Sequence, residues 1–295
     1  MDEVNKLPTD FFMHIPRSGG SSMRTLLTLN YAGEEKVALS GAFHELDWFL
    51  TRPREIRSSY RLVHGHYPFG LHAGLDNFRY FTLIREPIAR HFSEYFYARK
   101  YAHHHAHERI KTGELTLDYW AEVGEHHAFY HNNSLCQFLS REFHLSKPSH
   151  AMLQAACSNL EKMHVFGLTE RFTESALMIS KYMDWQYPVY GKRNVVMGNK
   201  SLPESVLSKA RKLQEWDIGL YEYACEIFEK RIQNEAKRFF PALEPYKEKI
   251  LQAQSNQESD SIRTVNRLLH PFFELFSVTL QPLHKVGGQF HVDVC

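Results

Sequence analysis

The chain has 295 residues, of which 43% are hydrophobic, enough to bury one large core or two modest ones, so the composition argues against overall disorder. Lys and Arg total 35 against 34 Asp and Glu, a formal net charge of +1. This balance excludes a global basic field of the kind that holds nucleic acid or an anionic membrane surface. A polyanionic partner must therefore meet a local patch.

Four short, nearly continuous apolar runs predict β-strands that are buried on both faces, as in a parallel sheet. They are residues 11–15, 60–64, 80–84 and 163–168. Apolar residues at helical spacing predict one helix over residues 22–31 and another that opens just after Pro87. Strands that alternate with helices predict a three-layer α/β fold, with a parallel sheet flanked by helices.

The C-terminal third is dominated by one predicted helix over residues 204–238, in which Ser201 and Glu204 have capping-box spacing around Pro203. Beyond Pro241 the composition shifts, and residues 255–261 are the best linker candidate. We therefore predict a main domain over residues 1–240 and a helical appendage over residues 241–295 that packs on it.

The four cysteines are widely spaced and form no Cys-x-x-Cys pair, which favours reduced thiols over a zinc site or a disulfide framework. They are Cys136, Cys157, Cys225 and Cys295. No apolar run approaches the roughly 18 residues that a membrane span needs, so the sequence predicts a soluble chain.

The first predicted strand leads through a short loop of small residues into a helix, an arrangement that directs backbone N–H groups and a helix dipole at an anion. Two glycines permit close approach, an arginine adds charge and three serines add donors. These residues are Arg17, Ser18, Gly19, Gly20, Ser21 and Ser22. The loop lacks the Lys and the glycine spacing of a P-loop. It is a candidate phosphate or sulfate site, although such a turn can also be purely structural.

His64 and His66 flank Gly65 where the second predicted strand ends. The carboxyl ends of parallel strands meet at one edge, so both side chains are expected close to the anion loop. A histidine near its ordinary pKa can take a proton from an alcohol. The alternative is a structural role for either imidazole.

Arg85 stands at the carboxyl end of the third predicted strand, and Ser93 lies two turns into the following helix. Together they could hold a second phosphate, at the far end of a nucleotide. Alternatively, Arg85 caps the sheet edge and pairs with Glu86 or another acid.

These segments, in this order, resemble the sulfotransferases that use 3′-phosphoadenosine 5′-phosphosulfate, most closely the group containing the heparan and uronyl 2-O-sulfotransferases. The matching runs are Pro16-Arg17-Ser18-Gly19-Gly20-Ser21-Ser22, His64-Gly65-His66 and Ile84-Arg85-Glu86-Pro87-Ile88-Ala89-Arg90-His91-Phe92-Ser93. Weaker matches cover residues 132–140 and 166–172.

The resemblance implies a P-loop-like nucleotide-binding architecture and an enzyme that moves a sulfuryl group to an acceptor hydroxyl, such as one on an acidic saccharide. It implies that Arg17 and residues 18–22 bind the 5′-phosphosulfate, and that Arg85 and Ser93 bind the 3′-phosphate. His66 would be the general base and His64 a helper or substrate contact. No metal would be required.

One departure from the family pattern is Arg17, which replaces a lysine that contacts the leaving oxygen, and a guanidinium differs from an ammonium in geometry. Because eukaryotic members of the group have a membrane anchor, its lack here implies a cytoplasmic, bacterial-type enzyme or an excised soluble catalytic domain. The alternatives are a P-loop-type kinase, which needs a loop lysine and an acidic magnesium ligand that are not evident, and a non-catalytic module that binds sulfated glycans.

Three further groups are assigned from the sequence. The imidazoles of His103, His104, His105 and His107 could bind a metal or line the site of an acidic acceptor, but a solvated helix end is favoured. The arginines Arg52, Arg54, Arg57 and Arg61 are interpreted first as a solvated face and second as an acceptor contact. Possible cofactor contacts in a later loop are Lys192, Arg193, Asn199, Lys200 and Ser201. The imidazoles of His126, His127 and His131 are unassigned.

Overall fold

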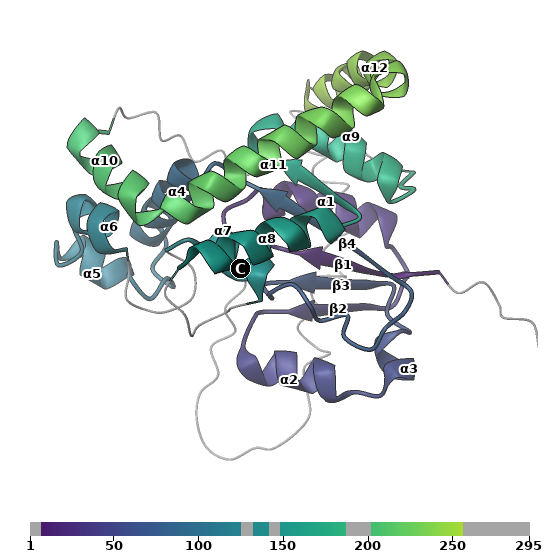
Figure 1. The fold of residues 1–295 in the computed structure, drawn as a ribbon, viewed down its shortest axis with the longest axis horizontal. Helices are drawn as coiled ribbons and strands as arrows, with labels where there is room; N and C mark the ends of the chain where they lie inside the picture. The colour runs from purple at the N-terminus through teal and green to yellow at the C-terminus, as the bar shows by residue number, and fades with distance from the viewer. Residues whose placement is uncertain (1–6, 125–131, 142–147, 187–201, 256–295) are drawn as a thin grey trace, which may run out of the picture.

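The computed structural model describes residues 7–124, 132–141, 148–186 and 202–255 (Figure 1). Three sets of sequence assignments lie outside these residues: the imidazoles at 126, 127 and 131, the loop contacts from Lys192 to Ser201, and most of the proposed linker and appendage.

Five parallel strands form one sheet in the order β2-β3-β1-β4-β5 (Figure 1). Their bounds are β1 Thr9–Met13, β2 Lys36–Leu39, β3 Leu62–Gly65, β4 Phe78–Ile84 and β5 Val165–Leu168. The predicted α/β fold with a parallel sheet is confirmed, and the four predicted strands lie within two residues of their expected positions. The short edge strand β2 was not predicted, because only its last residue is buried and the run therefore lacks a continuous apolar pattern.

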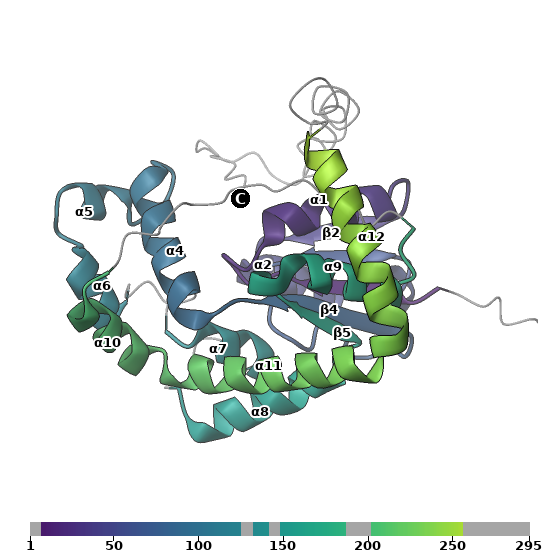
Figure 2. The same cartoon turned by 90° about the horizontal axis from the view of Figure 1, so that it is seen from above.

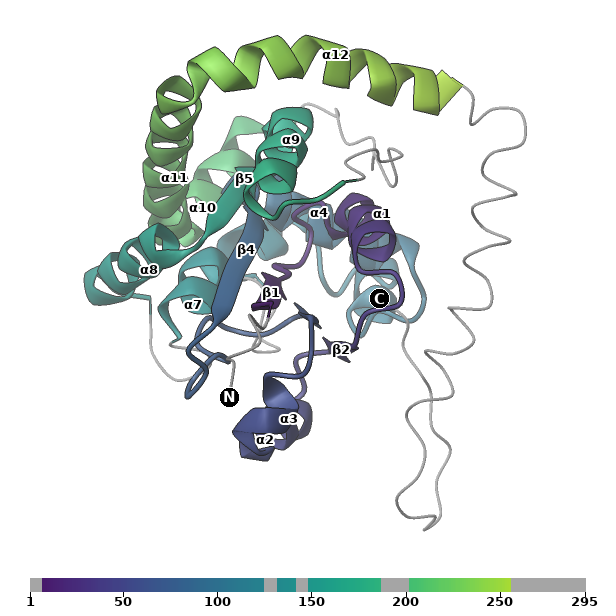
Figure 3. The ribbon, with the colours of Figure 1, turned by 90° about the vertical axis from the view of Figure 1, so that its right-hand side faces the viewer.

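Helices cover both faces of the sheet, and Figure 3 shows α1 and α9 on one side with α7 and α8 on the other. In Figure 2, α4, α5, α6 and α10 gather at one end of the sheet, where β4 leads into α4. The helix bounds are α1 Gly20–Asn30, α2 Phe43–Thr51, α3 Arg54–Arg57, α4 Pro87–Lys100, α5 His107–Lys111, α6 Leu117–Val123, α7 Ser134–Ser140, α8 His150–Lys162, α9 Phe172–Tyr182, α10 Glu204–Leu213, α11 Glu215–Asn234 and α12 Ala236–Ser255, with a 3₁₀ turn at Thr169–Arg171.

The single helix predicted over residues 204–238 is wrong: it is two helices, α10 and α11, with a break at Gln214. The side chain of Gln214 is fully buried, and its Oε1 accepts a hydrogen bond from the backbone N–H of Asn133 at 2.9 Å. This long-range contact holds the break in place. The predicted capping box is also wrong, because Pro203 is the N-cap of α10 and Ser201 lies outside the described residues.

The last described helix crosses the predicted domain boundary, since α12 begins at Ala236 and reaches Ser255 despite Pro241 and Pro245 within it. Its side chains Leu243, Tyr246 and Ile250 are each 4% exposed and belong to the main hydrophobic core. The division of the chain at residue 240 stays a prediction.

Two sequence expectations concern the whole chain. Of the helices that the structure describes, none is both long and apolar enough to cross a membrane. The described cysteines, Cys136, Cys157 and Cys225, are free thiols.

Two buried polar residues cap each other's helices where α7 and α11 meet. The carboxylate of Asp217 accepts hydrogen bonds from the backbone N–H groups of Leu135 at 2.9 Å and Cys136 at 2.8 Å. Oδ1 of Asn133 accepts from the N–H groups of Trp216 and Asp217, each at 3.0 Å. The first N–H groups of a helix have no intrahelical acceptor, so this exchange satisfies both helix starts inside the protein. It gives residues 132–140 a structural role.

We expect Asp217→Asn to destabilise the protein by about 1–3 kcal/mol, the usual cost of leaving a buried hydrogen-bonding group unsatisfied. The guanidinium of Arg90 is 1% exposed and lies within electrostatic range of Asp217. The substitution also turns an amide N–H₂ group toward a backbone N–H. Urea unfolding should show this loss, whereas Glu222→Gln, on the exposed face of α11, should change little; equal midpoints for the two variants would contradict the assignment.

Candidate active site

The loop between β1 and α1 has an unusual backbone. Arg17 has φ of 65°, and Gly19, the N-cap of α1, has φ of 83°, so both adopt the left-handed conformation. Ser18 is fully buried between them, and its Oγ has no hydrogen-bond partner among the described residues. The start of α1 directs backbone N–H groups at this loop, so the loop can offer donors to one external acceptor, such as an oxyanion; the N–H of Ser22 already donates to the carbonyl of Gly19 at 3.2 Å.

Gly20, the first residue of α1, is required by its neighbour His14. A Cβ atom at this position would lie 1.8 Å from Nε2 of His14. The His14 ring stacks on Phe12, with ring centroids 5.6 Å apart. Burial holds the pKa of His14 well below its ordinary value, so this imidazole is neutral and forms part of the wall behind the loop.

Gly65 makes the step between the two predicted histidines possible. Its φ is 140°, and a Cβ atom would lie 1.9 Å from the carbonyl oxygen of Leu39 on β2. The backbone N–H of His66 then donates to the same carbonyl at 3.0 Å. The chain thus turns out of β3 at Gly65 and brings the His66 ring against His14, with centroids 4.5 Å apart.

The hydrogen bond of His66 determines its tautomer. Nδ1 lies 2.8 Å from the carbonyl oxygen of His14, and a carbonyl can only accept, so Nδ1 carries the proton and the lone pair is on Nε2. Burial lowers the pKa of His66, and the nearby carboxylate of Glu94 acts in the opposite direction. The half-buried ring is therefore neutral near pH 7, the state that a general base needs.

His64 is also neutral, because burial first and the positive charges of Arg24 and Lys36 next lower its pKa to about 4. It pairs in register with Phe12 on β1 and Ala38 on β2. The charge of Arg24 on α1 also lowers the pKa values of His14 and His66.

Arg17 is turned toward α4. Its Nε donates to Oγ of Ser93 at 3.3 Å, and its guanidinium carbon lies 4.2 Å from the centre of the Tyr97 ring. Nη1 of Arg85 donates to the backbone carbonyl of Arg17 at 2.9 Å. The residues expected at the two ends of a nucleotide, Arg17, Arg85 and Ser93, are therefore in direct contact.

The acid beside Arg85 is Glu170, whose Oε1 lies 4.0 Å from Nε of Arg85 and also accepts from the N–H of Glu86 at 3.1 Å. The Glu86 carboxylate instead caps α4, accepting from the N–H groups of Ile88 at 3.0 Å and Ala89 at 2.6 Å. Glu86 thus fixes the start of the helix that carries Ser93.

Sequence reasoning missed three residues at this site: His14, Arg24 and Glu94. The side chain of Glu94 contacts both Arg17 and His104. Two of the three had a signal in the sequence, since Glu94 directly follows Ser93 and Arg24 lies about one turn into the helix that the loop opens. The direction of each side chain depends on packing that the sequence alone does not show.

The solvated helix end expected for the histidine cluster is wrong for two of its members. The side chains of His104 and His107 are 9% and 13% exposed. After α4 ends at Lys100 the chain folds back, and Nδ1 of His107 donates to the carbonyl of Ala98 at 3.0 Å. His103 contacts the hydroxyl of Tyr97 through Nε2 at 3.0 Å. The turn is therefore packed against α4 through His104 and His107, whereas His103 and His105 are exposed.

The solvated face expected for four arginines is likewise wrong for two of them. Arg57 is 7% exposed, and its guanidinium donates to the carbonyls of Arg52 at 3.1 Å and Ala73 at 2.7 Å. Arg61 lies 3.7 Å from the fully buried carboxylate of Asp10. Arg52 and Arg54 are exposed.

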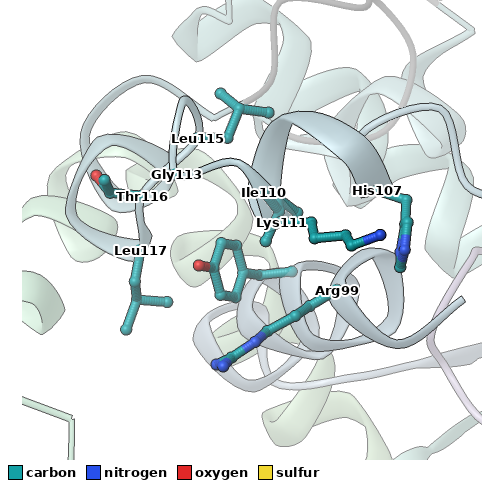
Figure 4. Close-up of a pocket in the computed structure, with 9 residues that line it drawn as sticks. Arg99, His107, Ile110, Lys111, Gly113, Leu115, Thr116 and Leu117 are labelled. Carbon is teal, nitrogen blue, oxygen red and sulfur yellow. The ribbon is translucent and has the colours of Figure 1, made fainter. Parts of the chain in front are cut away.

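A cavity of about 540 Å³ lies between α4, α5 and the segment that leads to α6, where Figure 4 shows Arg99, His107 and Lys111 around it. Helical spacing places Tyr95, which also lines the cavity, on nearly the opposite side of α4 from Ser93, so this cavity is separate from the loop site. In the described part of the chain, no three His, Cys, Asp or Glu side chains come close enough together to hold a metal ion.

Comparison with known proteins decides the family, because a family model described as "Sulfotransferase family" matches residues 11–224. The chain belongs to the sulfotransferase family. The match includes the loop between β1 and α1, His64 and His66, Arg85 and Ser93. No curated protein sequence matches this chain. Among solved structures, mouse sulfotransferase SULT7A1 complexed with PAP has a TM-score of 0.36 and 11% identity, and the match covers 70% of this chain but 64% of the mouse chain, just under two thirds of its length.

We expect Gly20→Ala to destabilise the protein by about 1–3 kcal/mol, because the new methyl group must displace the buried ring of His14. The matched control is Gly219→Ala in the middle of α11, where the nearest atom to the new Cβ lies at 3.5 Å. That variant should be more stable by about 0.5–1 kcal/mol, since alanine is the better helix former. Urea unfolding of both proteins measures the difference, and stabilisation by Gly20→Ala would show that His14 is placed differently.

Proposed function

We propose that this protein transfers a sulfuryl group from 3′-phosphoadenosine 5′-phosphosulfate to an acceptor hydroxyl, with Nε2 of His66 as the general base. The observation that carries the proposal is the 2.8 Å hydrogen bond from Nδ1 of His66 to the carbonyl of His14. It holds a neutral imidazole against His14, the first residue of the loop between β1 and α1. Membership of the sulfotransferase family supports the reaction class.

The donor nucleotide would be held along the loop and α4. The N–H groups at the start of α1 and the buried Oγ of Ser18 would bind the 5′-phosphosulfate, and Arg17 would add a permanent positive charge. Arg85 and Ser93 would bind the 3′-phosphate. The hydroxyl of Ser18, which has no hydrogen-bond partner in the described part of the chain, supports this assignment, since a buried polar group needs such a partner.

The reaction exchanges one S–O bond for another. The acceptor oxygen forms a bond to sulfur while its proton moves to Nε2 of His66, and the bond between sulfur and the bridging phosphate oxygen breaks. That oxygen leaves with the electron pair, as part of adenosine 3′,5′-bisphosphate. Such a transfer needs positioning and charge stabilisation rather than covalent catalysis, so Arg17 would stabilise the negative charge on the leaving oxygen.

The replacement of the family's lysine by Arg17 is compatible with this role. Ser93 and the ring of Tyr97 both hold the guanidinium, which limits the freedom of a long side chain. A planar guanidinium can donate to two oxygens at once. Arg17 would therefore contact the bridging oxygen and one non-bridging oxygen together.

The acceptor that we propose is a hydroxyl of an acidic saccharide, as in the heparan and uronyl 2-O-sulfotransferase group. The loop sequence and the His64-Gly65-His66 step support this subgroup. The test is incubation with labelled sulfate donor and a panel of glycans, lipids and small alcohols, with ATP as the control donor. Label transfer from ATP, with none from the sulfate donor, would replace the proposal with a kinase.

We expect His66→Ala to lower turnover by about 10²–10⁴-fold, the usual contribution of a general base, while affinity for adenosine 3′,5′-bisphosphate changes little. The control is His164→Ala, which removes an exposed imidazole that contacts the carbonyl of Tyr182 and should leave both quantities unchanged. Titration calorimetry and a sulfate-transfer assay measure them. Wild-type turnover in His66→Ala would assign the base to another residue.

We expect Arg85→Ala to abolish the preference for a nucleotide that carries a 3′-phosphate. Calorimetry should compare adenosine 3′,5′-bisphosphate with adenosine 5′-monophosphate in the wild type and in the variant. The control Arg211→Ala removes an exposed guanidinium of α10 that pairs with Glu204, and it should retain the preference. If Arg85→Ala still discriminates between the two nucleotides, the 3′-phosphate binds elsewhere.

A further inference from the structure

The two carboxylate oxygens of Glu94 contact two different segments: Arg17 in the loop after β1, and His104 in the turn over residues 103–107. Oε2 lies 3.7 Å from Nε of Arg17, and Oε1 lies 3.1 Å from Nε2 of His104. The side chain is 11% exposed. Ser93 and Tyr97, which also hold Arg17, lie on the same side of α4. One helix face thus presents a hydroxyl, a carboxylate and an aromatic ring to a single guanidinium.

The hydrogen bonds of His104 show which atoms carry protons. The backbone N–H of Ala106 donates to Nδ1 of His104 at 3.1 Å, so Nδ1 carries the lone pair. Nε2 must then carry the proton, and it donates to Oε1 of Glu94. The imidazole is therefore a hydrogen-bond donor to the Glu94 carboxylate, which also faces Arg17.

We propose that Glu94 is a positioning residue that holds the Arg17 guanidinium in place for the transferring sulfuryl group. This inference rests on the proposed function and extends it to a residue that touches neither the donor nor the acceptor. His104 holds the carboxylate by a hydrogen bond, so a continuous series of side-chain contacts runs from His104 through Glu94 to Arg17.

The charge of Glu94 argues against a role in nucleotide binding alone. A carboxylate beside a site for a polyanionic nucleotide repels the ligand, so binding would favour a neutral side chain here. We therefore infer that the carboxylate is present because it orients Arg17 during the transfer. Misplacement of a reacting group by about 1 Å can lower a rate about 100-fold.

The charged and titratable groups around His66 come from four elements. They are His14 after β1, Arg24 on α1, His64 on β3 and Glu94 on α4. Among those that act on the pKa of His66, Glu94 raises it and Arg24 lowers it. Loss of the carboxylate charge therefore lowers the pKa of His66, and the base stays unprotonated to a lower pH.

The test compares Glu94→Gln with the wild type, with Glu94→Asp and with Glu235→Gln as a matched control. Glu235 is a half-buried carboxylate on the far side of the fold that accepts a hydrogen bond from Tyr182 at 2.6 Å.

For Glu94→Gln we expect kcat to fall about 10- to 100-fold, affinity for adenosine 3′,5′-bisphosphate to stay equal or increase, and the acid limb of the rate profile to move to lower pH. Glu94→Asp keeps the charge, so its acid limb should stay near the wild-type position while its kcat falls. Glu235→Gln should match the wild type in all three measurements.

Two results would overturn the inference: wild-type kcat and acid limb in Glu94→Gln, or equal losses of nucleotide affinity and rate with no change in the pH profile, as a structural defect would produce. The failure of the proposed function has a different signature, because the wild type itself would then transfer no sulfate. NMR titration of His66 in the wild type and in Glu94→Gln tests the electrostatic link without any turnover, and identical titration curves would remove it.

Discussion

The site depends on one hydrogen bond between the ends of two neighbouring parallel strands. Nδ1 of His66, just past β3, donates to the carbonyl of His14, just past β1, at 2.8 Å. The bond fixes the orientation of the ring and its tautomer together, because a carbonyl oxygen offers no proton. It forms only because Gly65 turns the chain out of β3 at a φ that other residues rarely adopt, with the carbonyl of Leu39 too close for a side chain. The position of Nε2 relative to the loop follows from this backbone geometry.

The helix α4 carries the complementary half of the site. Glu86 caps its first turn, and Ser93, Glu94 and Tyr97 then project from one side toward Arg17. A loop residue with positive φ costs conformational energy unless its surroundings fix it, and Arg17 has three contacts from a rigid helix. The loop is thereby organised from two directions: β1 supplies its backbone and α4 holds its side chain. This arrangement explains how a long arginine can occupy a position where the family has a lysine.

A second constraint is a buried polar network that fixes how the helices α4, α7 and α11 pack on one another. Asp217 and Asn133 exchange helix caps between α7 and α11, and Gln214 joins this pair to His91 of α4 through a 3.2 Å contact. The network is buried, so each polar group would be costly to leave unpaired. It therefore fixes the relative positions of α4, α7 and α11, and through α4 it acts on the geometry around Arg17.

The sequence by itself determined the parallel α/β fold, the loop of small residues after β1 and the position of His66 close to the end of β1, because buried strands have continuous apolar runs and their carboxyl ends share one edge. It did not determine β2, the break at Gln214, or the places of Glu94 and His104. These depend on contacts between segments far apart in the chain. The edge strand has no continuous apolar pattern, Gln214 is held by Asn133, and the turn that carries His104 folds back on α4. Local periodicity reports which face of an element is buried, and only the tertiary structure decides which side chain from another element meets it there.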